Sequence, residues 1–139
     1  MPDVANHPTL IAWAPRMLSV LRIMAGLLFL AHGTQKILGF PPMAGGAPLP
    51  DALTLSWVAG VLELGLGALI TLGLLTRPAA FIASGEMAAA YVIGHAPRHF
   101  FPTLNGGDAA ILYCFVFLYL SVAGPGSWSL DALRRRRTA

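Results

Sequence analysis

Four long apolar segments, separated by proline- and glycine-rich links, define the organisation of this chain. Their hydrophobic patterns predict helices over about residues 16–38, 52–75, 78–94 and 107–123. A run of about 20 mostly apolar residues is long enough to cross the hydrocarbon core of a bilayer, and the fourth segment is at the short end of that range. The pattern therefore predicts an all-α protein, a transmembrane four-helix bundle that forms a single domain over residues 1–139.

A shorter segment follows the fourth helix. Residues 127–137 place Trp128, Leu130 and Leu133 on one helical face and charged residues on the other. Such an amphipathic segment is typical of a helix that lies in the membrane interface. We therefore expect a short C-terminal interfacial helix after the bundle.

The composition supports a membrane protein. The 139 residues are 56% hydrophobic and only 11% charged, whereas soluble domains average about 25% charged residues. The formal charge is +3, but four of the nine positive residues form the terminal run Arg134, Arg135, Arg136 and Arg137. Beside a membrane helix, such a run favours contact with anionic lipid headgroups over nucleic acid.

Positive residues also predict the orientation of the helices. Arg16, Arg77 and residues 134–137 fall on one side of the predicted membrane, whereas only Lys36 and Arg98 fall on the other. Cytoplasmic loops carry the excess of Lys and Arg. We therefore expect a multi-pass protein of the bacterial inner (plasma) membrane with both termini in the cytoplasm.

Three charged residues, Arg22, Glu63 and Glu86, lie away from the ends of the apolar segments. An isolated charge at that depth is unfavourable, so these residues are expected to face the interior of the bundle. Gly60 and Gly67 flank Glu63 at helical spacing and predict a face that a neighbouring helix can approach closely. One interpretation is a structural network in which Arg22 pairs with Glu63 or Glu86. A second, compatible interpretation is that one carboxylate handles a proton or contacts a quinone.

Polar residues also gather at the predicted outer ends of the first and third helices. A pocket there would contain His32, Gln35, Lys36, His95, His99, Asn105 and Asp108. Its groups could bind a quinone headgroup, or the histidines could simply bond to loop carbonyls, while Asp108 caps a helix and Asn105 begins a turn. Because Pro97 interrupts the spacing between His95 and His99, we expect no metal site.

Several local motifs, in order along residues 16–131, resemble the DoxX family of small four-helix membrane proteins. They are Arg22…His32-Gly33…Lys36, Glu63-Leu64…Gly67…Thr76-Arg77-Pro78, Gly85-Glu86-Met87-Ala88, His95-Ala96-Pro97…Asn105-Gly106-Gly107-Asp108 and Gly124-Pro125-Gly126-Ser127…Asp131.

The resemblance implies a role beside redox enzymes. Some DoxX relatives are subunits of a thiosulfate:quinone oxidoreductase, and others are linked to membrane redox complexes or thiol stress. A thiol-redox role is disfavoured here because Cys114 is the single cysteine. We therefore expect an accessory subunit that contacts quinone or partner subunits in the bilayer and carries no covalently bound cofactor.

Such a subunit would be non-catalytic alone, or the small subunit of an oxidoreductase within a larger complex or homo-oligomer. Two alternatives remain open. One is a purely structural subunit of a respiratory or photosynthetic complex, and the other is a small proton-coupled transporter that uses Glu63 and Glu86.

Overall fold

The computed structural model describes residues 7–138, and all regular structure in this range is helical. The longer helices are α1 (Pro8–Leu38), α2 (Leu55–Leu72), α3 (Thr76–Ala90), α5 (Asp108–Ala123) and α6 (Leu130–Thr138). A 3₁₀ turn, η2 (Ala44–Gly46), and the four-residue helix α4 (Pro102–Asn105) lie in the two long links, and a π-helical turn, η3 (Tyr91–His95), continues α3. The all-α prediction is confirmed.

The helix boundaries differ from the predicted ones in ways that the ends explain. The first helix begins at Pro8, well before the predicted start at residue 16, and continues through Pro15. Pro8 suits the first turn, where a backbone N–H has no intrahelical partner. The second helix begins after Thr54, whose hydroxyl accepts the N–H of Trp57, and ends at Gly73 in the left-handed conformation.

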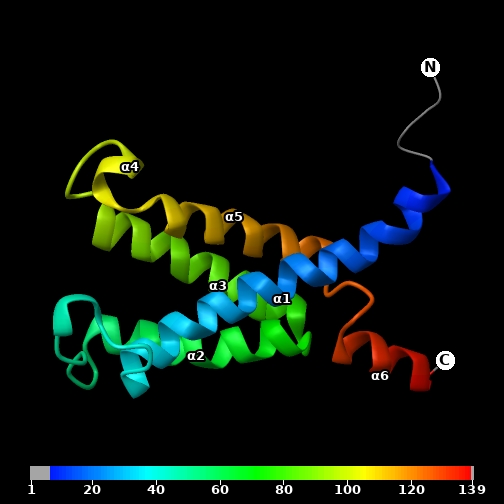
Figure 1. Ribbon diagram of the computed structural model, residues 1–139, viewed down its shortest axis with the longest axis horizontal. Coiled ribbons are helices and arrows are strands. Elements are labelled where there is room, and N and C mark those ends of the chain that lie inside the picture. The colour runs from blue at the N-terminus through cyan, green and yellow to red at the C-terminus, as the bar shows by residue number, and fades with distance from the viewer. Residues whose placement is uncertain (1–6, 139) are drawn as a thin grey trace.

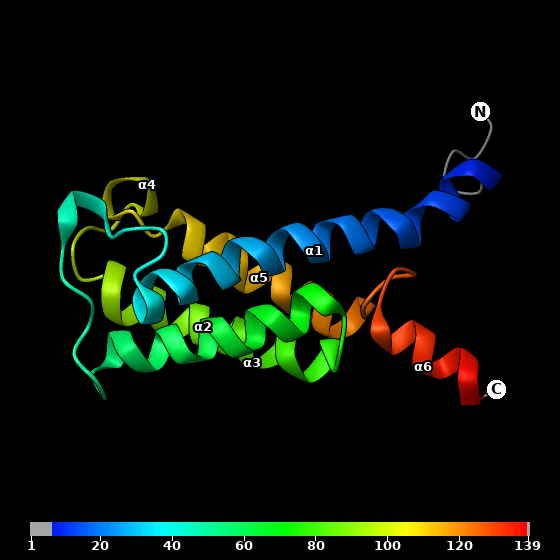
Figure 2. The same cartoon turned by 60° about the horizontal axis from the view of Figure 1, so that its bottom comes forward.

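The four long helices α1, α2, α3 and α5 run alternately in opposite directions (Figures 1 and 2). Contacts join α1 to α2, α2 to α3 and α3 to α5, with a sparser contact between α1 and α5. The start of α1 and helix α6 lie at one end of this assembly, and the links 39–54 and 96–107 lie at the other (Figures 1 and 2). The predicted separation of a basic end from a loop end is therefore present in the fold.

Small side chains fill much of the interior, while large apolar side chains cover the outside. Ala25, Ala79, Ala80 and Ala83 are buried, together with the rings of Phe29 and Phe117. Exposed large apolar residues include Met24, Leu28, Phe81, Leu112 and Phe115. Helices α1 and α2 are long and apolar enough to cross a membrane, and α5 is a shorter apolar helix. An apolar surface of this extent fits contact with lipid.

Glycines bring α1 and α2 unusually close together. A Cβ atom on Gly33 would lie 2.4 Å from the backbone nitrogen of Leu64, and one on Gly67 would lie 2.7 Å from that of Leu30. On Gly60, a Cβ would lie 2.7 Å from the Cβ of Lys36. The predicted small-residue face around Glu63 is therefore the surface on which α1 packs.

Candidate functional site

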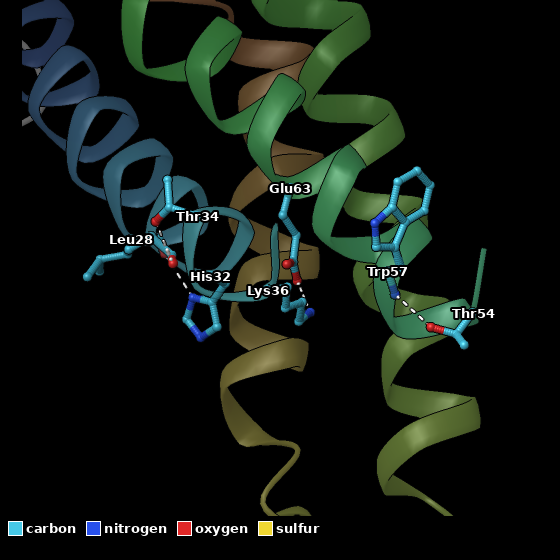
Figure 3. A network of polar contacts seen from close by, with 8 residues as sticks. Leu28, His32, Thr34, Lys36, Thr54, Trp57 and Glu63 are labelled. Atoms are coloured by element: carbon cyan, nitrogen blue, oxygen red, sulfur yellow. Dashed lines mark hydrogen bonds and ion pairs between the residues drawn. The ribbon is translucent and has the colours of Figure 1, made fainter. Parts of the chain in front are cut away.

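The close approach of α1 and α2 creates a buried ion pair. The Lys36 ammonium donates to Oε1 of Glu63 at 2.7 Å, and the Glu63 side chain is only 4% exposed. Figure 3 shows the two side chains pointing toward one another from their helices. The second oxygen of Glu63, Oε2, is also buried and has no hydrogen-bond partner. Lys36 thus satisfies one of the two oxygens of this carboxylate.

A second carboxyl group, that of Glu86 on α3, faces the same interior. Both of its oxygens are buried without a hydrogen-bond partner, and it interacts electrostatically with Glu63 and Lys36. We call Lys36, Glu63 and Glu86 the inner cluster. It holds two carboxyl groups for one ammonium group, so its electrically neutral form carries one proton on the carboxyl groups.

Aromatic side chains connect the inner cluster to the surface between α1 and α5. We call Phe29 and His32 of α1, with Tyr113 and Phe117 of α5, the aromatic seam. The ring centroids of Phe29 and Phe117 are 4.8 Å apart, those of Tyr113 and Phe117 5.6 Å, and those of His32 and Tyr113 6.2 Å. Phe29 and Phe117 are buried, Tyr113 is half-buried and His32 is exposed. Because Tyr113 interacts electrostatically with Glu63, the seam links the surface to the inner cluster.

His32 has a defined ring orientation. Its Nδ1 lies 2.8 Å from the carbonyl oxygen of Leu28 (Figure 3). A carbonyl can only accept, so Nδ1 carries the hydrogen. In the neutral ring Nε2 is then the acceptor, and in the charged ring it is a second donor. The exposed histidine can therefore accept a hydrogen bond from a bound hydroxyl group or donate one to a carbonyl oxygen.

Arg22 does not join the carboxylates as expected from the sequence. Its fully buried guanidinium donates instead to backbone carbonyls of Ile70 and Thr71 at the end of α2, and of Pro125 and Trp128 in the link before α6. The partner of Glu63 is Lys36, a residue that the sequence predicts in the outer pocket. Arg22 cannot reach Glu63 because it lies near the opposite end of the α1–α2 contact and already holds four carbonyl groups.

The carbonyl contacts of Arg22 belong to a larger set of hydrogen bonds that fixes the C-terminal segment. Trp128 N–H donates to the Ser19 hydroxyl, and the Asp131 N–H donates to the carbonyl of Gly73. The Asp131 carboxylate in turn accepts the N–H groups of Leu75 and Thr76, each at 3.0 Å, at the start of α3.

Burial alone would raise the pKa of Asp131, but these backbone hydrogen bonds and the charge of Arg135 together hold it below its ordinary value. This role of Asp131 is not among the expectations from the sequence. The available signal was the motif from Gly124 to Asp131 (Gly124-Pro125-Gly126-Ser127…Asp131), which contains the contact points.

The predicted outer pocket is divided into separate groups. Asn105 is buried, donates to the carbonyl of His99 and accepts the N–H of Gly107, while Nδ1 of His95 bonds to the Asn105 carbonyl. Gln35 donates to the carbonyl of Pro42, in the other link. Within residues 7–138, no hydrogen bond joins these loop residues to His32 or Lys36.

The remaining residues of the predicted pocket also lie apart from His32 and Lys36. The expectation that Asp108 caps a helix is wrong: Gly107 is the N-cap, and Asp108 is exposed in the first turn of α5, where no side-chain cap hydrogen bond forms. Nδ1 of His95 bonds to a loop carbonyl, as one interpretation of the sequence expects, whereas Nδ1 of His99 accepts the backbone N–H of Phe101. Of the pocket residues, His32 and Lys36 alone join the aromatic seam or the inner cluster.

Comparison with known proteins identifies relatives of this chain. The DoxX family model matches residues 17–96, which contain Arg22, His32 and the whole inner cluster. An uncharacterized protein of Haemophilus influenzae is 45% identical over 124 residues, which cover 86% of this chain and 91% of that protein.

Two relatives carry names that place them in membranes. An uncharacterized membrane protein of Mycobacterium tuberculosis is 32% identical, with 92% of this chain and 88% of that protein covered. Inner membrane protein YphA of Escherichia coli is 33% identical, with 84% and 89% covered. No solved structure gives a significant match. The chain belongs to the DoxX family of membrane proteins.

Proposed function

We propose that this protein is an accessory subunit of a quinone-linked redox complex in the bacterial inner membrane and contacts quinone at the aromatic seam. The observation that carries the proposal is the order of groups from lipid to interior. An exposed histidine, His32, comes first, followed by the half-buried Tyr113 and then by the buried Glu63. A partly exposed aromatic ring, a polar group beside it and carboxyl groups behind it suit a quinone ring and its oxygens.

The chemistry divides between this chain and its partner. A quinone that takes two electrons must also take two protons to form the quinol, and the reverse reaction releases them. A partner redox subunit would donate the electrons to the quinone, or accept them in the reverse reaction. His32 and Tyr113 would bond to the quinone oxygens, while the inner cluster would hold or release a proton near Tyr113.

The proposed placement has four membrane-spanning helices and both termini in the cytoplasm. Helix α3 with its π-helical turn covers residues 76–95, and α5 covers residues 108–123, lengths that approach the usual span. The basic end would then face the cytoplasm, and the four arginines of α6 would lie among anionic headgroups. Reporter fusions at Ala139 and within residues 43–47 should give opposite sidedness, and equal signals would refute the placement.

Quinone titration of the detergent-solubilised protein tests the proposed site. A short-chain quinone should bind saturably, and Tyr113→Phe should weaken binding about fivefold to tenfold because it removes one hydrogen bond of about 1–1.5 kcal/mol. Tyr119→Phe is a matched control, since Tyr119 lies on the same helix and is 58% exposed. This control should change affinity less than about twofold. Non-saturable binding, or equal effects of the two variants, would contradict the proposal.

A further inference from the structure

The C-terminal helix is fixed beside the turn between α2 and α3. Asp131 accepts the N–H groups of Leu75 and Thr76 and donates its own N–H to the carbonyl of Gly73 at 2.9 Å. These bonds hold the first turn of α6 against the start of α3. The arginines that follow on α6 are therefore presented beside Arg77 rather than on a free tail.

Three of these cationic side chains line one cleft. Its volume is about 330 Å³, and its walls include Arg77, Pro78, Pro125, Asp131, Arg134 and Arg135. The Asp131 carboxylate stays ionised at neutral pH because the backbone hydrogen bonds and Arg135 together lower its pKa. Three guanidinium groups against one carboxylate leave the cleft with a net charge of +2. Such a site favours a phosphate group, which guanidinium groups bind with paired hydrogen bonds.

An apolar groove adjoins this basic cleft. It has a volume of about 210 Å³ and is lined by Leu74, Leu130 and Leu133, with Arg134 and Arg137 at its edge. Arg134 lines both spaces. A ligand that fits both would carry an anionic phosphate joined to an apolar chain.

We propose that the cleft and the groove together form a binding site for one anionic phospholipid. The headgroup phosphate lies between Arg77, Arg134 and Arg135, and the first part of an acyl chain lies against Leu74, Leu130 and Leu133. The site rests on the proposed placement of α6 at the membrane surface, and it is independent of the quinone contact. Binding of one lipid at a defined site differs from the diffuse attraction that any run of arginines exerts on an anionic bilayer.

Adjacent arginines of α6 provide a matched test. A fluorescent short-chain phosphatidylglycerol is titrated into the full chain in a non-ionic detergent. Arg134→Gln and Arg135→Gln should each weaken binding about fivefold or more, a factor that corresponds to about 1 kcal/mol per arginine. Arg136→Gln removes the same charge from the same helix, but Arg136 lines a different cleft with Arg16 and Trp128. This variant should change affinity less than about twofold.

Competition separates the possible sources of the phosphate. Excess phosphatidylglycerol should displace the probe, whereas phosphatidylcholine and inorganic phosphate should not. Displacement by inorganic phosphate would overturn the lipid assignment, because the apolar groove would then contribute nothing. Equal losses in all three arginine variants would also overturn it and indicate non-specific attraction. Quinone titration of Arg134→Gln should match that of the unmodified chain, so failure of the lipid site is distinguishable from failure of the quinone site.

Discussion

The Lys36–Glu63 pair allows a quantitative stability prediction. Lys36→Met removes the ammonium group but leaves the Glu63 carboxylate buried, with both oxygens unpartnered. Breaking a buried ion pair from one side destabilises a protein by about 3–5 kcal/mol. We therefore expect a loss of about 3–5 kcal/mol in the free energy of unfolding at pH 7.

A double-mutant cycle isolates the pair from other effects of the substitutions. Glu63→Gln removes the carboxylate charge, so adding Lys36→Met to it should be much less harmful than Lys36→Met alone. The coupling free energy should be about 2 kcal/mol or more. Unfolding of the purified protein by SDS in dodecylmaltoside micelles, followed by tryptophan fluorescence and circular dichroism, provides the four free energies.

Arg22 supplies the control for this cycle. Arg22→Met should also be strongly destabilising, because it removes the side-chain donor from the carbonyl groups of Thr71, Pro125 and Trp128. The carbonyl of Ile70 also loses Arg22 but still accepts the N–H of Gly73. Its effect should add to that of Glu63→Gln within about 0.5 kcal/mol, as expected of residues that share no partner. Additive effects of Lys36→Met and Glu63→Gln, or strong coupling between Arg22 and Glu63, would refute the assigned pairing.

Three further predictions concern packing, pH and the outer loop. Gly67→Ala should lower the free energy of unfolding by about 1–3 kcal/mol, because its Cβ would lie 2.7 Å from the Leu30 nitrogen. Gly65→Ala, whose Cβ would meet nothing within 4 Å, should be neutral or slightly stabilising. Equal losses of stability in the two variants would contradict the close helix contact. The unmodified chain should be more stable than Asp131→Asn above the ordinary carboxyl pKa, and this difference should disappear as pH falls through the lowered pKa of folded Asp131. Thermal unfolding of both proteins from pH 7 downward measures the difference. A difference that persists in strong acid would contradict the role of the Asp131 carboxylate. Asn105→Ala should increase proteolysis within residues 96–107, because the Asn105 side chain joins His99 to Gly107. His99→Ala serves as the comparison variant. Unchanged cleavage in Asn105→Ala would show that Asn105 does not order the loop.

Much of the fold follows from features that the sequence displays locally. Apolar length predicted the four long helices, and the spacing of Gly60, Glu63 and Gly67 predicted a close contact around a carboxylate. Both features depend on period and side-chain size within one segment. Helix ends were less predictable, because other residues near Pro8 and Thr54 are also able to begin a helix.

Partner choice among the charged residues could not be obtained in the same way. Arg22, Lys36, Glu63 and Glu86 all lie on helices, and the sequence does not state which helices are neighbours or at what depth each charge lies. The antiparallel contact of α1 and α2 sets Lys36, rather than Arg22, opposite Glu63. Arg22 instead meets backbone carbonyls, and a backbone carbonyl has no signature in a sequence.

Photoaffinity mapping of the quinone contact tests the central claim most directly. A short-chain azidoquinone would be activated in membranes that contain the full chain, and labelled residues would be identified by mass spectrometry. The proposed site predicts labels on α1 around His32 and on α5 around Tyr113, which an excess of unlabelled quinone removes. Labels confined to other helices, or labels at these positions that unlabelled quinone does not displace, would contradict a quinone site at the aromatic seam.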